Sequence, residues 1–303
     1  MADPQAHFAA CEICGADNWT SVRVGPVRDG AFGNLSGPDA EIAQCAGCAA
    51  QRLDETSCTD AGTYETPAYR EKLQQATDAE GFFDEHDIMQ LQNLSVLWPN
   101  SLRGSTVADI GCAAGSFLDH VHGLVDSAVA VEPFTGYHDS LRARGYDVFQ
   151  YADGAAANWT GRIDRAFSFS VLEHVDDPRR FLSDIATLLT ASGELMLSTP
   201  NRTDALMDLL PDAYPAFFYR SVHRWYFDAA SLTNLAEHAG LVVREIQCVH
   251  RYGLSNALRW IRDRKPGGRE AMPHIDARLD AVWQRHLEAE GAGDYLYARL
   301  ARR

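Results

Sequence analysis

The segment Val107–Leu118 (VADIGCAAGSFL) constrains the fold more than any other part of the 303-residue chain. An apolar run that ends around Asp109 leads into a Gly-x-x-x-Gly turn, from Gly111 to Gly115, and then into an amphipathic helix. Glycine lets the backbone approach a ligand closely, and the free N–H groups at a helix start face that ligand. The spacing differs from Gly-x-Gly-x-x-Gly, and the sequence contains no Gly-Lys-Ser/Thr phosphate loop. Because Asp109 would repel a pyrophosphate, we expect a ligand that carries an ammonium group.

Further strand-like segments follow this loop, and polar or acidic residues stand at their ends. They are Ala128–Glu132, the strand 147–151 with Asp153 and Gly154 after it, Phe167–Pro178, and Leu195–Asn201. A single Gly-x-x-x-Gly would more often be a packing turn, but four such segments in this order are hard to obtain by chance.

Together these segments resemble the class I S-adenosylmethionine (SAM) methyltransferases, roughly over residues 104–250 and 294–302. The resemblance implies that Glu132 holds both ribose hydroxyls, since a carboxylate can accept two hydrogen bonds. It also implies that Asp153 and Gly154 meet the adenine amino group. Ala113 stands where the commoner form of the loop has glycine, and alanine suits a helix start. The SAM-binding residues implied in this way are Asp109, Gly111, Ala113, Gly115, Glu132, Pro133, Asp153, Gly154 and Ser170.

Strand and helix patterns alternate after residue 104, which predicts an α/β fold. Such alternation implies a doubly wound, mostly parallel sheet that binds its ligand at the carboxyl ends of the strands. With the resemblance, we expect a seven-stranded, Rossmann-like methyltransferase fold. The expected strands are 106–110, 128–132, 147–151, 165–170, 193–198, 241–248 and 295–300, and the expected helices are 115–123, 135–144, 178–190 and 228–239.

Four of the seven cysteines form two Cys-x-x-Cys pairs, Cys11 with Cys14 and Cys45 with Cys48. Two such pairs about thirty residues apart have the spacing of a tetrahedral structural zinc site. Two disulfides are disfavoured in a cytosolic chain, and neither pair opens an obvious helix, as a redox pair would. We therefore expect the four cysteines to bind structural Zn²⁺ within a small ribbon of short strands and turns.

Three regions follow from these patterns. Residues 1–60 are expected to form the zinc ribbon, and residues 61–103 a helical lid or linker, with a helix over about 64–100 that stops at Trp98-Pro99-Asn100. Residues 104–303 are expected to form the methyltransferase domain. A helical insertion at about 251–292, broken near Pro266, would cap the sheet or make a homodimer contact.

Acidic side chains outnumber basic ones, 42 to 27, for a net charge of −15. Residues 1–100 hold 16 acidic and 5 basic side chains. Because nucleic-acid binding draws most of its affinity from cations on phosphates, this balance argues against such a partner. No apolar run approaches the ~20 residues that span a bilayer, and no secretory signal is apparent. We expect a soluble cytoplasmic protein with no membrane partner.

Methyl transfer requires an aligned acceptor, exclusion of water and often removal of a proton. Glu173 and His174 follow the fourth strand, and His223 lies in the long segment after the fifth. A histidine commonly takes the hydroxyl proton in metal-free O-methyltransferases of this fold, so we expect His174 or His223 as the base, although either could only shape its loop. Tyr64 and Tyr69 would cover the cofactor or merely pack. We expect no catalytic divalent metal, since no second cluster of carboxylates is evident.

An amino-terminal zinc ribbon on this fold resembles bacterial methyltransferases of sugar and glycan biosynthesis. The leading expectation is a SAM-dependent methyltransferase of a small molecule, a sugar or related metabolite, with oxygen favoured over carbon. Arginines within 251–269 would hold a phosphorylated or nucleotide-linked acceptor, or form a solvated face. The alternatives are an RNA methyltransferase that uses the ribbon for recognition and a non-catalytic SAM-binding scaffold. The sequence contains no Asn-Pro-Pro-Tyr-like base pocket, which weakens the RNA alternative.

Overall fold

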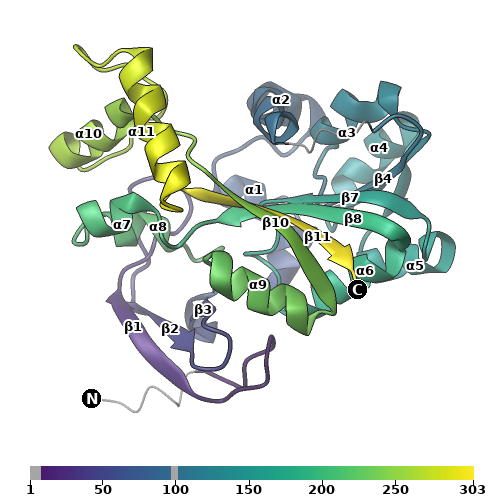
Figure 1. Cartoon of the computed structure of the whole chain (residues 1–303), viewed down its shortest axis with the longest axis horizontal. Coiled ribbons are helices and arrows are strands. Elements are labelled where there is room, and N and C mark those ends of the chain that lie inside the picture. The colour runs from purple at the N-terminus through teal and green to yellow at the C-terminus, as the bar shows by residue number, and fades with distance from the viewer. Residues whose placement is uncertain (1–7, 97–101) are drawn as a thin grey trace.

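The computed structural model describes residues 8–96 and 102–303. Its centre is a seven-stranded sheet in the order β10-β11-β8-β7-β4-β5-β6, in which β11 alone runs antiparallel to its neighbours (Figure 1). This sheet confirms the expected doubly wound, Rossmann-like methyltransferase fold. Its strands are β4 (Thr106–Ile110), β5 (Ser127–Val131), β6 (Asp147–Phe149), β7 (Ile163–Phe169), β8 (Leu189–Pro200), β10 (Leu241–Val249) and β11 (Tyr295–Arg302).

Helices cover both faces of this sheet, which is why its central strands are apolar along most of their length. One face carries α2 (Ala79–Ser95), α3 (Ser116–Val121) and α4 (His138–Ala143), and the other carries α5 (Ala152–Trp159), α6 (Pro178–Leu188) and α9 (Ala229–His238) (Figure 1). The short 3₁₀ helices η4 (His122–Leu124) and η5 (Thr135–Tyr137) adjoin α3 and α4. Asp228 caps α9, because its carboxylate accepts the N–H of Ser231 at 2.8 Å.

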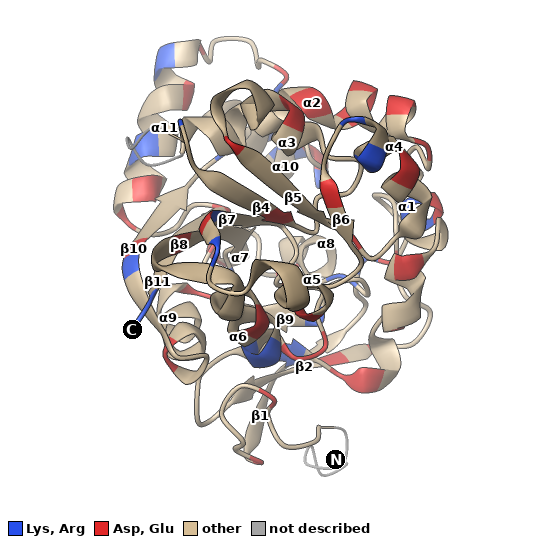
Figure 2. Ribbon diagram, turned by 90° about the vertical axis from the view of Figure 1, so that its right-hand side faces the viewer, with Lys and Arg blue, Asp and Glu red and all other residues tan. Residues whose placement is uncertain are grey.

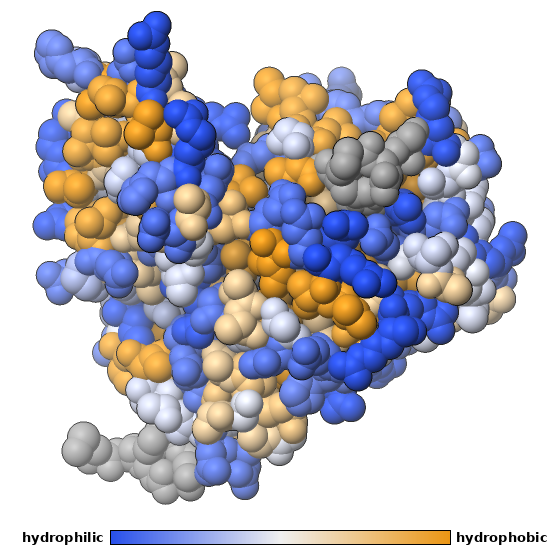
Figure 3. Space-filling model, in the orientation of Figure 1, coloured by the Kyte–Doolittle hydropathy of each residue, from blue (hydrophilic) through white to orange (hydrophobic). Residues whose placement is uncertain are grey.

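The segment between β10 and β11 forms two helices, α10 (Leu254–Asp263) and α11 (Ala277–Ala289), in agreement with the expected interrupted insertion. Trp260 of α10 packs against Tyr214 and Phe217, at ring-centroid distances of 5.2 and 4.9 Å. Those two rings belong to α8 (Tyr214–Phe218), which follows α7 (Ala205–Leu209). Exposed apolar side chains gather on the α10–α11 projection at the upper left of Figure 3; they are Ile261, Leu279 and Val282.

The lid region differs from the single helix expected over 64–100. After η2 (Glu55–Ser57) at the end of the amino-terminal module, the lid region contains η3 (Ala61–Glu65) and α1 (Ala68–Lys72) before α2 begins at Ala79. The break has two local causes: Gln74 adopts a left-handed conformation with φ of 57°, and Asp78 caps the new helix by accepting the N–H of Gly81 at 2.9 Å. The predicted stop at Trp98-Pro99-Asn100 lies outside the described residues.

The amino-terminal strands form a second sheet whose last member comes from far along the chain. The strands β1 (Trp19–Gly25), β2 (Ala40–Cys45) and β3 (Gln51–Leu53) pair in order, and β9 (Trp225–Tyr226) then pairs with β3. The expected ribbon of short strands is present, but the sequence did not predict that β9 joins it, because a two-residue strand carries no period of its own.

Backbone hydrogen bonds hold residues 219–226, here called the 219–226 segment, against the amino-terminal module. Arg28 and Ser221 are central to this contact: Arg28 N–H donates to Tyr219 O at 2.9 Å, and Ser221 N–H donates to Arg28 O at 2.9 Å. Thr59 N–H also donates to Ser221 O, at 2.7 Å. The side chain of Arg224 reaches the carboxylate of Glu55 at 2.5 and 2.9 Å. The amino-terminal module therefore determines where this segment lies. Within the described residues, no helix is both long and apolar enough to cross a membrane.

Candidate functional site

A cavity of about 800 Å³ lies at the carboxyl ends of β4, β5 and β7. This is the place where open α/β sheets bind ligands. Its lining combines the residues that follow these strands with side chains from the lid region and from the 219–226 segment. The cavity therefore has two ends, one formed by the glycine loop and the other formed by aromatic and basic residues.

At the loop end, Asp109 is 4% exposed and accepts no hydrogen bond from the described part of the chain. Desolvation, together with the nearby charge of Glu132, raises the pKa of Asp109 to about 8. A buried carboxylate without a partner is costly, and a cationic ligand in the cavity would relieve that cost. The position of Asp109 thus fits the ammonium-bearing ligand expected from the sequence.

The two glycines of the loop cannot be replaced by larger residues without strain or steric overlap. Gly111 and Gly115 have φ of 82° and 89°, in the left-handed region. A Cβ atom on Gly111 would overlap the side chain of Val171, and one on Gly115 would lie 2.6 Å from Leu141 Cδ2. Ala113 adopts φ of 49°, a left-handed conformation that favours glycine, and α3 begins only at Ser116, so the expectation that this alanine stands at a helix start is wrong.

Glu132 lies at the end of β5 with its carboxylate directed at the loop. One oxygen accepts the N–H of Ala113 and the other accepts the N–H of Phe134, both at 2.8 Å. Each carboxylate oxygen can accept a second hydrogen bond, and Glu132 and Pro133 both line the cavity. Burial raises the pKa of Glu132. This arrangement is compatible with the ribose contact that the resemblance implies.

Three further predicted cofactor residues lie around the same end. Strand β6 is shorter than expected, so Asp153 and Gly154 fall in the first turns of α5. Asp153 lines the cavity, whereas Gly154 is not one of the described residues that line it. The carboxylate of Asp153 pairs with Arg180 at 3.3 Å. Ser170 lines the cavity with φ of 56°, and its Oγ lies 2.9 Å from the hydroxyl of Tyr295.

At the other end of the cavity, the fold brings together the three predicted catalytic residues. Glu173, His174 and His223 each place one potential metal-ligating atom within 4.8 Å of the others. Glu173 and His174 come from the tail of β7, whereas His223 belongs to the 219–226 segment. Sequence analysis singled out each residue but could not show that they form one cluster, since 49 positions separate the two histidines.

The hydrogen bonds distinguish the two histidines. Nδ1–H of His174 donates to the carbonyl of Val222 at 2.6 Å, which leaves Nε2 with its lone pair. That Nε2 makes no hydrogen bond with the described residues. The hydroxyl of Tyr64 donates to the same carbonyl, at 2.7 Å. In His223, by contrast, Nε2 lies 3.4 Å from Nη1 of Arg220, and Nδ1 is buried without a partner among the described residues.

Burial keeps both imidazoles neutral. It lowers the pKa of His174 to about 3, and it lowers the pKa of His223 well below the ordinary value. Glu173 behaves oppositely: burial raises its pKa to about 7, although its carboxylate accepts a hydrogen bond from Thr199 Oγ1 at 3.2 Å. The three side chains could in principle ligate a cation, but the guanidinium of Arg220 beside His223 would repel one.

Aromatic rings close this end of the cavity. The rings of Tyr64 and Tyr69 lie 4.9 Å apart, and both contact the ring of His174, at 5.4 and 5.7 Å. Burial raises the pKa of each tyrosine, so both stay neutral phenols. The sequence suggested these two tyrosines as a cover. It did not single out the other cavity residues that surround them, which are Arg70, Phe82, Arg220, Tyr295 and Tyr297; they are separated along the chain and share no motif.

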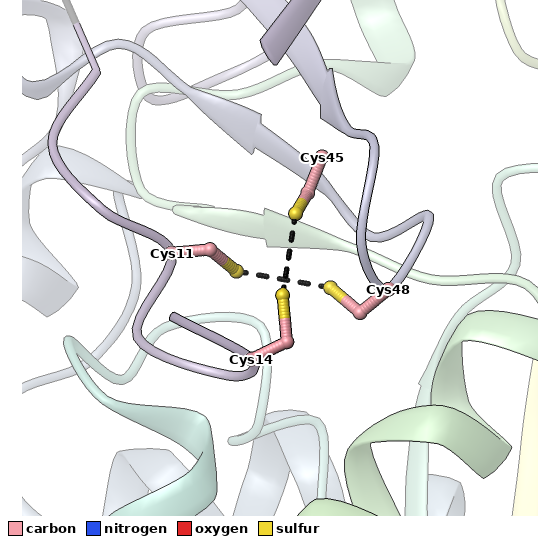
Figure 4. A group of neighbouring side chains, drawn as sticks. All are labelled: Cys11, Cys14, Cys45 and Cys48. Carbon is pink, nitrogen blue, oxygen red and sulfur yellow. Dashed lines mark hydrogen bonds between the residues drawn. The ribbon is translucent and has the colours of Figure 1, made fainter. Parts of the chain in front are cut away.

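The four paired cysteines form a separate cluster in the amino-terminal module. Figure 4 shows their sulfurs pointing toward a common centre from two turns. The Sγ atoms of Cys11 and Cys48 are 3.7 Å apart, and those of Cys14 and Cys45 are 3.5 Å apart. Sulfurs in a disulfide lie about 2.05 Å apart, whereas Zn–S bonds of about 2.3 Å place tetrahedral sulfurs about 3.8 Å apart. The donor set therefore fits a Zn²⁺ ion.

Glycine is needed in the second cysteine turn. A Cβ atom on Gly47 would lie 2.8 Å from Cys14 Sγ, and the N–H of Gly47 donates to Cys45 Sγ at 3.4 Å. In the first turn, Gly15 has φ of 77°. A glycine next to a cysteine therefore shapes each of the two turns.

The curated proteins that resemble this chain in sequence include two ubiquinone biosynthesis O-methyltransferases. The ubiquinone biosynthesis O-methyltransferase of Aeromonas salmonicida is 28% identical over 180 residues, which are 52% of this chain and 71% of that protein. The protein of the same name from Xanthomonas oryzae pv. oryzae is 31% identical over 115 residues, 36% of this chain and 48% of that protein. Neither match extends over the whole of either chain.

Similar chains are also found among solved structures. One of them is a SAM-dependent methyltransferase from Thermotoga maritima, a possible histamine N-methyltransferase, with 20% sequence identity and a TM-score of 0.48 over 74% of this chain and 94% of that one. A family model for a methyltransferase domain matches residues 83–246, more than half of the chain. That range includes the glycine loop and both histidines. The chain therefore belongs to the methyltransferase domain family and is a SAM-dependent methyltransferase.

Proposed function

We propose that this enzyme methylates a hydroxyl group of a small-molecule acceptor bound between His174 and the glycine loop. The observation that carries this proposal is the free Nε2 of His174, which lines the same cavity as the unpartnered carboxylate of Asp109. The names of the Aeromonas and Xanthomonas relatives favour oxygen over carbon as the acceptor atom. A sugar or related metabolite, nucleotide-linked or not, remains the acceptor predicted from the sequence.

SAM supplies a methyl group that is already activated by its sulfonium centre. For its binding, we assign the ammonium group to Asp109, the ribose hydroxyls to Glu132 and the adenine amino group to Asp153, as the resemblance implies. Gly111 and Gly115 allow the backbone of the loop to approach the ligand. Ala113, Pro133, Gly154 and Ser170 complete the predicted set, with Gly154 acting through the backbone of α5.

His174 acts as the proton acceptor in this proposal. The carbonyl of Val222 fixes the Nδ1–H tautomer, so the lone pair of Nε2 is available to a hydroxyl in the cavity. His223 and Glu173 orient the acceptor and tune the charge around it. The tyrosine pair Tyr64 and Tyr69 keeps water from the reacting atoms.

The RNA alternative is less well supported. Helix α2, beside the cavity, carries four acidic side chains and neither lysine nor arginine (Figure 2). Phosphate backbones bind to cationic surfaces, not to acidic ones. The scaffold alternative would leave the free base and its aromatic cover without a role.

We further propose that Zn²⁺ occupies the Cys11, Cys14, Cys45 and Cys48 cluster and has a structural role. Four thiolates leave no open coordination position for a substrate. The ion would hold together the module that pairs with β9 and bonds to the 219–226 segment. A homodimer through the exposed apolar side chains of α10 and α11, and a cytoplasmic location, remain predictions.

The proposed acceptor class can be tested by labelling. Methyl-deuterated SAM incubated with the enzyme and a cell extract, separated into small metabolites and RNA, should label a metabolite that carries a hydroxyl group. Mass spectrometry detects the added mass and identifies the acceptor. Label found only in RNA would overturn the small-molecule proposal, and label in neither fraction would favour the scaffold.

The loop assignment predicts a contrast between two glycines. Gly111→Ala should weaken SAM binding at least tenfold, because its Cβ would overlap Val171 and its φ is strained for alanine. Gly154→Ala should leave SAM affinity unchanged within about twofold, since no atom lies within 4 Å of the new Cβ and alanine favours a helix. Isothermal titration with SAM measures both. Equal affinities in the two variants would contradict the assigned loop.

Changing the two histidines separately tests the base. His174→Ala should lower kcat by roughly 10²–10⁴-fold, the usual contribution of a general base, without changing SAM affinity. His223→Ala should have a smaller effect. A general base stops accepting protons only when the pH falls through its pKa, and the pKa of His174 is about 3. This residue should therefore cause no decline in kcat/KM between pH 8 and 5. If neither variant slows transfer, the assignment is wrong.

Loss of zinc should damage the acceptor site more than the SAM site. Cys45→Ser is expected to release the metal, to lower the free energy of unfolding and to reduce kcat/KM for the acceptor at least tenfold, while SAM affinity changes little. Cys58→Ser is the matched control, because Cys58 lies outside the cluster. Metal content by mass spectrometry and calorimetric SAM titration give the readouts. Full zinc-free activity in Cys45→Ser would rule out this structural role.

A further inference from the structure

The arginines that line the cavity fall into two groups. Arg180 and Arg251 are neutralised, the first by Asp153 at 3.3 Å and by Asp184, and the second by Asp294 at 2.7 Å. The other two, Arg70 and Arg220, have no carboxylate within ion-pair distance among the described residues. A guanidinium that is withdrawn from water without a counter-ion is costly, so these two point to something that the cavity is built to receive.

Of the two, Arg220 has the more weakly hydrogen-bonded guanidinium. Its guanidinium has five N–H donors. Only Nη1 contacts a described side chain, at 3.4 Å from His223 Nε2, and Nε is buried without an acceptor among the described residues. Its backbone is fixed by the bridge to Arg28 and by a hydrogen bond from its N–H to Tyr226 Oη at 2.9 Å. These contacts fix the position of the Arg220 backbone at the edge of the cavity that its side chain lines.

A second unpaired cation lies directly behind it. Arg28 is mostly buried, its guanidinium lies 4.1 Å from the ring centroid of Phe217, and it has no carboxylate partner among the described residues. Burial and the charge of Arg220 lower the pKa of Arg28 to about 9. Arg28 does not line the cavity itself, but its charge adds to that of Arg220, which does, and both favour an anion at this wall.

The charged groups around Arg220 place it at the acceptor end. Its charge lowers the pKa values of Glu173, His174 and His223. The charge of Arg70, in contrast, lowers the pKa values of both Glu132 and His174, which places Arg70 between the two ends. Arg70 therefore has two possible ligands, the carboxylate of SAM or the acceptor, whereas Arg220 has the acceptor alone. Glu173 interacts electrostatically with Arg220, but its carboxylate accepts a hydrogen bond from Thr199 and forms no ion pair with Arg220.

We propose that Arg220 binds an anionic group of the acceptor, a carboxylate or a phosphate, next to the hydroxyl that is methylated. This inference rests on the proposed function, because it assigns the acceptor to the His174 end of the cavity. The guanidinium can donate two parallel hydrogen bonds to such an oxyanion. Burial is the main cause of the low pKa of His174, and the charge of Arg220 lowers it further. Binding of an anion would offset that second contribution, so an anionic acceptor would raise the basicity of its own proton acceptor.

The experiment measures binding of small probes to the full chain saturated with S-adenosylhomocysteine, at constant ionic strength. The probes are salicylate, which has a carboxylate beside its hydroxyl, its uncharged amide salicylamide, and inorganic phosphate. We expect at least one of the anions to bind about tenfold or more tightly than salicylamide. Tight salicylate binding would indicate a carboxylate acceptor, and tight phosphate binding a phosphorylated one.

Variants then assign the preference to Arg220. Arg220→Met should reduce it to within about twofold, and Arg220→Lys should keep part of it, since lysine retains the charge but not the forked geometry. Arg262→Met is the control: it removes the same charge from an exposed arginine that is already paired with Asp263 at 2.6 Å. Thermal unfolding and S-adenosylhomocysteine affinity show whether each variant is folded. If Arg220→Met does not fold, Arg220→Lys, which keeps the charge, carries the test.

No anion preference in the wild type, or a preference that survives loss of Arg220, would overturn the proposal. The failure of this inference is distinguishable from that of the proposed function. Methyl transfer to an uncharged acceptor at equal rates in wild type and Arg220→Met would leave the methyltransferase proposal standing while this inference fails. Anion binding that depends on Arg220, without methyl transfer to any acceptor, would support the anion site while the proposed methyl transfer fails.

Discussion

The pairing of β3 with β9 is the contact on which the arrangement of the acceptor end depends. It is short, with Gln51 opposite Tyr226 and Arg52 opposite Trp225. Around it, the bonds of Arg28 and Thr59 to the 219–226 segment hold the backbone that carries Arg220, Val222 and His223. The long connection between β8 and α9 would otherwise have many conformations. The amino-terminal module thus serves as a wall of the cavity and is not only an appendage.

Desolvation is the second constraint, and it disfavours the charged forms of acids and bases at both ends of the cavity. At the loop end it raises the pKa values of Asp109 and Glu132, so a cationic ligand would be stabilising there. At the far end it lowers the pKa values of His174 and His223, and two arginines lack counter-ions. One cavity therefore offers a negative subsite and a positive subsite. Such a separation suits a positively charged methyl donor and an acceptor of opposite charge.

The family match and the acceptor features cover different parts of the molecule. Residues 83–246 contain the sheet strands β4 to β8, the glycine loop and the histidine cluster. The cysteine cluster, Arg28, Tyr64, Tyr69 and Arg70 all precede that range. Helices α10 and α11 follow it. The methyl-donor end thus lies in the part that the family shares, while several side chains around the acceptor come from outside it.

The sequence by itself determined the sheet, the glycine loop, the acid at the end of β5 and the pairing of cysteines, because each depends on residues that are close along the chain. Period, turn residues and fixed spacing are local properties, and Asp228 as the cap of α9 is another example. Only the tertiary structure decided that β9 joins the amino-terminal sheet, that His223 meets His174, and that Arg220 has no carboxylate partner among the described residues. These facts depend on contacts between segments that are more than forty residues apart. No local pattern records such contacts, since their energy comes from burial and from charges that meet only when the chain is folded.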